Sequence, residues 1–342
     1  MKNSKIFIMC ILLMSSQFAK SQSNYSIINK ISIEGDGGWD YLFADEATNR
    51  VYISHSTQVQ VLDVAAKKVV GTISDLKGVH GIAVANDLNK GFISNGKDSS
   101  VTVFDLKTFS IIVKVNIAGR NPDAILYDEF SHRVFTFNGG SDNASVLDAK
   151  TNKVLGMITL DGKPEFSVTD GKGKIYVNIE DKSMVKMINP ATMKVEKEWS
   201  VSPGQEPSGL AYDKANQRLF SVCDNKMMAV SDALTGKVIT TLPIGERVDG
   251  AAFDSQLKRA YSSNGDGTMT VVQQKDKDTY EVLENVATQK GARTIAVNTK
   301  TNHLFLPTAE YGETPAVTEE NKHPRPSIKP GSFVILEIAP TK

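Results

Sequence analysis

A pattern of short apolar runs repeats along the chain about every 42 residues, and this repeat constrains the fold more than any other feature. One run in each repeat begins near position 51, 91, 134, 175, 219, 260 or 304, so successive runs lie 40, 43, 41, 44, 41 and 44 residues apart. Each repeat contains several runs of four to eight residues, rich in Val, Ile, Phe and Thr and separated by Asn, Gly, Asp and Lys. Runs of this length and composition favour β-strands over helices.

Four short antiparallel strands per repeat are typical of a propeller blade. Seven sets of the first three strands are visible, but only six of them are followed by a fourth strand. The segment Tyr25–Gly35 precedes the first set and has the pattern of a fourth strand, so it can pair with the last blade and leave no long edge unpaired. We therefore predict an all-β fold, a seven-bladed β-propeller with four antiparallel strands per blade, whose ring is closed by the N-terminal strand.

The first 21 residues have the composition of a secretory signal peptide. Two lysines precede an apolar core at Ile6–Met14, and Ala19 and Ser21 provide the small residues of a cleavage site. We expect cleavage near Ser21, a periplasmic or secreted protein, and a single propeller domain over residues 22–342. No later run reaches the roughly 18 apolar residues of a membrane span, so we expect no membrane-spanning segment.

The charge balance disfavours one class of partner. The sequence holds 39 basic and 39 acidic residues, and removal of a signal with three lysines and no acids leaves 36 basic against 39 acidic residues. Proteins that bind nucleic-acid backbones usually carry a basic excess, so nucleic-acid binding is disfavoured. Cys223 would be the single cysteine of the mature chain, which excludes an intramolecular disulfide. We expect a monomer.

Recurring motifs within the repeats point to a family. RVYIS, RVFTFNG and KIYVN occupy predicted second strands, and the frames VTVFDLKTFSII and MAVSDALTGKVI cover third strands and the turns after them. These motifs resemble the YVTN repeats of YncE-like seven-bladed propellers, and the resemblance covers essentially all of the mature chain. It implies the propeller fold and export. It implies no particular reaction, because the family shares no single activity.

Alignment of the blades places a polar residue at the start of every innermost strand, where the strands should surround one mouth of the central channel. The seven residues are Asp40, His80, Asp123, Glu165, Ser208, Asp249 and Arg293. They are polar or charged in strands that are otherwise apolar, so we predict a ligand site at this mouth for a small molecule or a partner protein. The alternative is a hydrated channel wall that binds nothing.

A second set of mostly polar residues lies at the ends of the second strands. It comprises His55, Asn95, Asn138, Ile179 with Asn178 beside it, Cys223, Asn264 and Thr308. The loops that follow these strands should open on the same face as the innermost strand starts. We therefore expect His55, Asn95, Asn138 and Asn264 to contribute to the same ligand site.

Carboxylates and imidazoles converging on one mouth could support three kinds of chemistry. A divalent cation could be held by a subset of Asp40, His80, Asp123, Glu165 and Asp249. A carboxylate crowded by like charges would have the raised pKa that a general acid or base needs. Arg293 could bind an anionic group of a ligand. The alternative to simple binding is therefore a metal-dependent hydrolase, similar in architecture to lactonase propellers, and no catalytic residue is assigned.

The last blade carries a proline-rich insertion at about residues 309–331. Five of the chain's twelve prolines fall within or beside it, and it separates two strands by about 19 residues more than in other blades. Prolines favour an extended and partly rigid path, and loops inserted beside pockets often control access to them. We predict a lid over the charged mouth that offers polar groups from Tyr311, His323 and Arg325.

Overall fold

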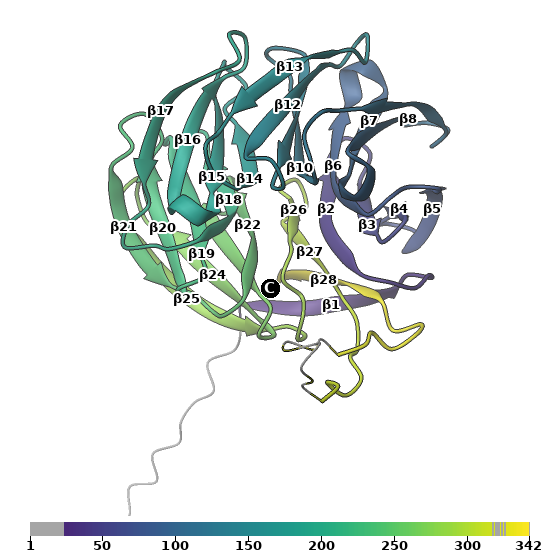
Figure 1. Cartoon of the computed structure of the whole chain (residues 1–342). Helices are drawn as coiled ribbons and strands as arrows, with labels where there is room; N and C mark the ends of the chain where they lie inside the picture. Colours follow the sequence, from purple (N-terminus) through teal and green to yellow (C-terminus); the bar gives the residue numbers. More distant parts are fainter. Residues whose placement is uncertain (1–23, 317, 319–321, 323, 325, 342) are drawn as a thin grey trace, which may run out of the picture.

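Seven four-stranded antiparallel sheets surround a central channel in the computed structural model of the chain (Figure 1). The structure describes residues 24–316, 318, 322, 324 and 326–341. Each sheet is one blade, and the innermost strands of neighbouring blades contact one another all the way round the ring. The predicted seven-bladed β-propeller is therefore confirmed. The innermost strands are β2 (Trp39–Asp45), β6 (Val79–Ala85), β10 (Pro122–Asp128), β14 (Pro164–Thr169), β18 (Pro207–Asp213), β22 (Val248–Asp254) and β26 (Ala296–Asn298).

The remaining strands of each blade follow outward from the channel. The second strands are β3 (Arg50–His55), β7 (Lys90–Asn95), β11 (Arg133–Asn138), β15 (Ile175–Ile179), β19 (Arg218–Cys223), β23 (Arg259–Asn264) and β27 (His303–Thr308). The third strands are β4 (Gln58–Asp63), β8 (Ser100–Asp105), β12 (Asn143–Asp148), β16 (Met184–Asn189), β20 (Met227–Asp232), β24 (Thr268–Gln274) and β28 (Val334–Pro340). The outermost strands are β5 (Lys68–Ile73), β9 (Ile111–Asn116), β13 (Val154–Thr159), β17 (Lys194–Ser200), β21 (Val238–Pro243), β25 (Tyr280–Ala287) and β1 (Tyr25–Ser32).

Among the described residues, helical structure is confined to short 3-10 turns in the loops. They are η1 (Asn86–Leu88), η2 (Gly96–Asp98) and η3 (Glu180–Lys182). Within the described ranges, no helix has the length and apolar character needed to cross a membrane.

The hydrophobic core lies between the blades. The second and third strands are buried on both faces because a neighbouring blade packs on each side, which explains why they read as continuous apolar runs. Between the first two blades, for example, Tyr52, Ile93 and Phe104 pack together, and burial of each such side chain contributes about 1.5–3 kcal/mol. Gly91 lies beside them. The position requires glycine, because a Cβ atom there would approach the Phe104 ring to 2.1 Å.

The N-terminal strand closes the ring as predicted. β1 pairs antiparallel with β28, in a register that runs from Tyr25 opposite Pro340 to Ser32 opposite Val334. The Tyr25 hydroxyl lies 2.7 Å from the hydroxyl of Tyr261 in the preceding blade and accepts a hydrogen bond of 2.8 Å from Arg259 Nη1. The last blade thus combines strands from both ends of the chain and leaves no unpaired gap in the ring.

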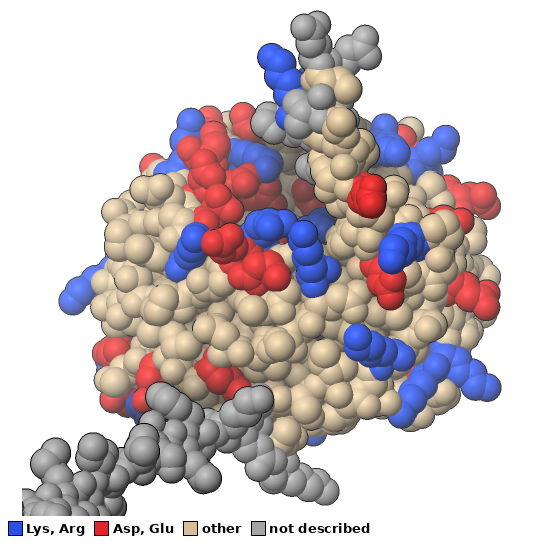
Figure 2. Space-filling view, turned by 90° about the horizontal axis from the view of Figure 1, so that it is seen from below, with Lys and Arg blue, Asp and Glu red and all other residues tan. Residues whose placement is uncertain are grey.

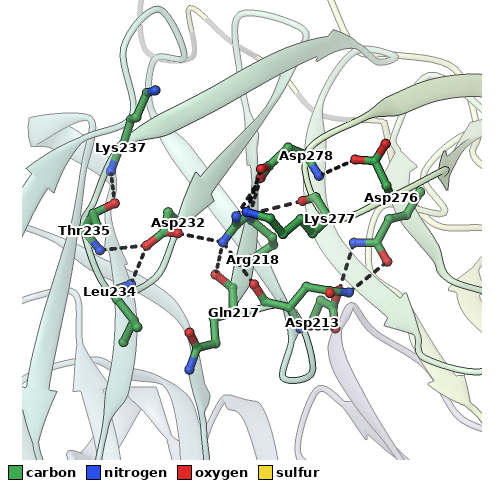
Figure 3. A network of polar contacts seen from close by, with 12 residues as sticks. Asp213, Gln217, Arg218, Asp232, Leu234, Thr235, Lys237, Asp276, Lys277 and Asp278 are labelled. Carbon is green, nitrogen blue, oxygen red and sulfur yellow. Dashed lines mark hydrogen bonds and ion pairs between the residues drawn. The ribbon is translucent and has the colours of Figure 1, made fainter.

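A buried arginine joins the fifth and sixth blades (Figure 3). It lies on the side opposite the strand starts, because Arg218 pairs with Asp213 at the end of β18. Arg218 is only 4% exposed. Its Nη1 atom lies 2.7 Å from Asp232 Oδ2, and its Nη2 atom lies 2.6 Å from Asp278 Oδ1 in the loop between β24 and β25. Backbone carbonyls of Asn216, Gln217 and Lys277 accept further hydrogen bonds from the guanidinium group. This charge is therefore fully partnered.

Candidate functional site

A β-bulge turns the polar residues at the strand starts toward the channel. In each of the first six innermost strands, the register with the second strand shifts at this point, as it does between Trp39 and Leu42 in β2. A bulge frees backbone groups and redirects a side chain. Hydroxyl groups satisfy the freed groups around Asp40: its amide donates to Ser54 Oγ (3.0 Å), and its carbonyl accepts from Thr294 Oγ1 (2.7 Å). The bulge is therefore held by contacts within and between blades.

Three residues from the first three blades form the most compact part of the mouth. His80 Nδ1 lies 2.6 Å from Asp40 Oδ2 and 3.6 Å from Asp123 Oδ1. Each of the three residues offers a ligand atom, and these atoms lie within 4.8 Å of one another. Imidazole and carboxylate ligands at this spacing could hold a divalent cation. The buried Asp123 Oδ1 atom has no hydrogen-bond partner among the described residues.

Arg293 connects this cluster to the sixth blade. Its Nε atom lies 2.6 Å from Asp249 Oδ2, and its Nη2 atom lies 3.4 Å from Asp40 Oδ1. Arg293 belongs to the loop before β26, because the innermost strand of the last blade begins only at Ala296. The guanidinium side chain remains 38% exposed, in contrast to that of Arg218.

Glu165 is neutralised in part by a lysine from the loop above it. Lys163 Nζ lies 2.6 Å from Glu165 Oε1 and also contacts Glu180 in η3. Glu165 itself is 7% exposed. Ser208 completes the set of strand starts without adding charge, since it is buried and its hydroxyl donates to the carbonyl of Val248 in the next blade (3.2 Å). The mouth therefore holds four carboxylates against Arg293, Lys163 and the titratable His80.

The excess of buried negative charge shifts the titration of the mouth. Burial, reinforced by the charge of Asp40, raises the pKa of Asp123 to about 7. Burial and the charge of Asp123 raise the pKa of Glu165 to about 8. Burial also raises the pKa of Asp249 to about 6, although Arg293 acts in the opposite direction. Burial lowers the pKa of His80, but the carboxylates of Asp40 and Asp123 raise it by more, so the pKa of His80 lies above its ordinary value. These groups can therefore exchange protons near neutral pH.

Tyr41 is a member of the mouth that the sequence analysis missed. It follows Asp40 within the bulge, is 8% exposed, and its ring packs against Phe166 at 5.2 Å between centroids. Burial, followed by the charges of Asp123, Asp249, Glu165 and Asp40, raises the pKa of its hydroxyl well above the ordinary value. The sequence does distinguish Tyr41. When the blades are aligned, the position that follows each strand-start residue is usually small, and only Tyr41 and Phe166 are aromatic there.

The residues at the ends of the second strands lie away from the channel wall, which differs from the expectation. His55, Asn95, Asn138 and Asn264 are each at most 1% exposed, and their side chains bond within their own blades, for example His55 Nδ1 to Gln60 Oε1 (2.8 Å). The pairing explains this difference. These residues face Trp39, Val79, Pro122 and Val248, each one position before a strand-start residue, and alternate positions point to opposite faces of a strand.

The base of the proline-rich insertion is ordered and packs beside the mouth. Tyr311 forms an isolated antiparallel bridge with Ile328, and the Gly312 amide donates to the carbonyl of Ser327 (2.8 Å). The Tyr311 ring lies 6.2 Å from the Trp39 ring, centroid to centroid. His323 and Arg325, the other predicted lid residues, lie outside the described residues. Figure 2 shows acidic and basic side chains gathered round a hollow beside the projecting segment.

The channel beyond the charged mouth is largely apolar. A cavity of about 430 Å³ lies between the innermost strands and is lined by residues such as Ile82, Ile125 and Leu210, together with Tyr41 and Phe166. The charged residues thus lie at one end of an apolar channel. A ligand at the mouth would meet polar groups first and apolar groups deeper in the channel.

Comparison with solved structures supports the fold alone. The chain is similar to a chain of the hydrazine synthase of Kuenenia stuttgartiensis (16% identity, 80% of this chain and 94% of that chain covered, TM-score 0.69). It is also similar to a chain of the mitotic checkpoint complex (11% identity, 89% and 95%, TM-score 0.73) and to U3-55K (8% identity, 92% and 98%, TM-score 0.75). No protein-family model and no curated protein sequence matches the chain.

Proposed function

We propose that the chain is an exported, YncE-like propeller that binds a small ligand at the charged mouth. The observation that carries this proposal is the Oδ1 atom of Asp123. It is buried within a group of four carboxylates, and no described residue donates a hydrogen bond to it, although His80 Nδ1 lies 3.6 Å away. Buried charges are costly unless they are paired, and a protein selected for stability alone would have no reason to gather them. A ligand that donates hydrogen bonds or carries positive charge at one end would relieve this excess.

The proposal of export rests on the signal-like sequence at residues 1–21, which lies outside the described residues. The YncE-like assignment rests on the repeat motifs and agrees with the seven-bladed fold. The proposal of export and the YncE-like assignment do not depend on which ligand the mouth binds. Sequencing of the mature N-terminus after expression in a Gram-negative host would test export, with cleavage near Ser21 as the expected result and an intact N-terminus as the contradictory one.

A thermal-shift screen of small metabolites tests the ligand proposal. We expect at least one compound to raise the Tm of the protein, and we expect Asp123→Ala to abolish that shift. The matched control is Asp148→Ala, because Asp148 ends a third strand and accepts hydrogen bonds from Thr151 in a turn remote from the mouth. Equal ligand-induced shifts in the wild type and in Asp123→Ala would place the binding site elsewhere.

The cluster of Asp40, His80 and Asp123 favours a second candidate, a cation-dependent hydrolase of lactones or related esters. A divalent cation held by these three residues would supply a Lewis acid. The carboxylate of Asp249 could then accept the proton of an attacking water molecule, because its pKa of about 6 lies near neutrality and leaves it mainly charged there. The proton would pass to the alcohol oxygen released when the ester bond breaks.

Metal analysis separates the two candidates. Protein purified without chelators should contain one equivalent of a cation that is lost in His80→Ala and retained in Asp148→Ala, if the hydrolase proposal holds. Metal-free protein whose Tm does not respond to Ca²⁺, Mn²⁺ or Zn²⁺ would exclude the hydrolase and leave the binding proposal intact.

A further inference from the structure

A second cavity, of about 750 Å³, lies beside the mouth and beneath the base of the proline-rich insertion. Its walls come from the loops before β22 and β26, the start of β2, and the insertion. The lining residues that matter for its chemistry are Trp39, Arg247, Lys290, Arg293, Tyr311 and Ile328. A cavity of this size is large enough for a small organic molecule.

The charge of this cavity is opposite to that of the mouth. Arg247, Lys290 and Arg293 line it, and no acidic residue is among the described lining residues. Arg293 is already paired with Asp249 and Asp40. Arg247 and Lys290 make no side-chain hydrogen bond or ion pair with any described residue. Two cationic side chains are thus available to an anionic group of a ligand, and Arg293 lies at the border between the cavity and the mouth.

Aromatic rings form a rigid wall of the cavity. Trp39 is 7% exposed, stacks on Phe333 at 5.2 Å between centroids, and has a buried Nε1 atom without a hydrogen-bond partner among the described residues. Tyr311 is held against the loop before β26, where Gly291 has a φ of +88° and a Cβ atom would come within 2.3 Å of the Tyr311 hydroxyl. Flat, fixed rings of this kind bind the face of a ring-shaped ligand at little entropic cost.

We infer that this cavity is an anion subsite, and that the ligand is a ring-bearing organic acid whose carboxylate or phosphate group lies between Arg247 and Lys290. The inference rests on the proposed function, because Arg293 both lines the cavity and contacts Asp249 and Asp40 of the mouth. The ring of the ligand lies against Tyr311, and its hydrogen-bond donors face the carboxylates of the mouth. Sugar acids, sugar phosphates and aromatic acids share this chemistry.

Isothermal titration calorimetry with matched pairs of compounds tests the inference. The acids are glucuronate, glucose 6-phosphate and benzoate, and their neutral partners are glucose and benzyl alcohol. We expect at least one acid to bind and its neutral partner to bind at least about tenfold more weakly, because charge-assisted hydrogen bonds are the stronger ones. The preferred acid distinguishes a sugar from an aromatic ring and a carboxylate from a phosphate. Failure of all three acids to bind, or equal binding of acids and neutral compounds, would overturn the inference.

Variants assign the binding to the cavity. Arg247→Gln/Lys290→Gln should weaken binding of the acid about tenfold or more. Both side chains are exposed, so the variant should fold. Lys275→Gln is the matched control, because Lys275 pairs with Glu281 on the outer part of the sixth blade. Unchanged affinity of the double variant for the acid would overturn the inference.

Asp123→Asn distinguishes failure of this inference from failure of the proposed function. Loss of acid binding in the double variant, with full binding in Asp123→Asn, would support the anion subsite and contradict a ligand at the mouth. A mouth ligand that is lost in Asp123→Asn but binds the double variant normally would support the proposed function and contradict the anion subsite. Loss in both variants supports both.

Discussion

Arg218 and Arg293 each contact two aspartates, but their surroundings differ. Arg218 is buried, and its guanidinium group bonds to Asp232, Asp278 and three backbone carbonyls (Figure 3). Burial acts to raise the pKa of Asp232, but turn amides and Arg218 lower it overall. Bonds from Lys277 and Arg218 lower the pKa of Asp278. The charges in this network are balanced, and each aspartate is stabilised as the anion.

Arg293 contacts two of the four carboxylates of the mouth and cannot neutralise the whole group. Its partner Asp249 has a raised pKa, because burial and the charge of Asp40 outweigh the effect of the arginine. Asp123 and Glu165 have raised pKa values for similar reasons. The comparison shows that an ion pair does not reveal its role by its geometry alone. The direction of the carboxylate pKa values separates a structural network from a site that retains unsatisfied charge.

Removal of Arg218 should have the largest effect on stability. Arg218→Leu leaves Asp232 and Asp278 without their common partner, and we expect a loss of about 3 kcal/mol in the free energy of unfolding, measured with urea. Ligand binding at the mouth should not change at temperatures where the variant is folded. Lys275→Gln, which breaks an exposed pair, should lose less than about 1 kcal/mol. A similar small loss for Arg218→Leu would mean that the network is not structural.

Arg293→Gln should have a smaller effect that depends on pH. At pH 8 the carboxylate of Asp249 is charged, and we expect loss of its arginine to cost about 1–2 kcal/mol. At pH 5 Asp249 can hold a proton instead, since its pKa is about 6 even beside the arginine, so the cost should decrease. Urea unfolding at both pH values measures the difference. An equal cost at both would contradict the account of the mouth given above.

Asp123→Asn should stabilise the protein at pH 8, where the buried carboxylate of the wild type is charged. The folded state binds the Asp123 proton with a pKa of about 7, against an ordinary value of 3.8. Stability from this group is therefore present below pH 3.8 and is lost as the pH rises toward 7 and beyond. The wild type and Asp123→Asn should differ little at pH 4 and most at pH 8. Asp148→Asn should instead destabilise at pH 8, since turn hydrogen bonds lower the pKa of Asp148 despite burial.

The fold could be predicted because each blade repeats the same pattern of strand-forming and turn-forming residues. Strand composition, turn residues and spacing recur seven times, so a doubtful strand assignment in one blade can be checked against the other blades. The missing fourth strand identified β1 as its replacement, because a closed ring requires as many outer strands as inner ones. The presence of the insertion was visible in the spacing, but its packing was not. The contact of Tyr311 with Trp39 depends on residues far apart in the sequence.

The candidate site was only partly predictable. The strand-start residues converge because they occupy equivalent positions in the repeat. The contacts among them, such as His80 with Asp40, depend on side-chain orientation across blades and are not encoded in the alignment. His55 and the asparagines were misplaced because one residue of register decides which face a side chain occupies. Tyr41 was missed because a tyrosine in an innermost strand resembles an ordinary core residue.

The pairing of β1 with β28 also sets an order of events while the chain is synthesised. Roughly 300 residues separate Ser32 from Val334, and at about 5–20 residues per second β1 waits about 15–60 s for its partner. Throughout that time Ile31 and Ile33, which are buried in the finished ring, have no β28 to cover them. A nascent chain of this protein is therefore exposed to aggregation or proteolysis until β28 has been made, however stable the finished propeller is.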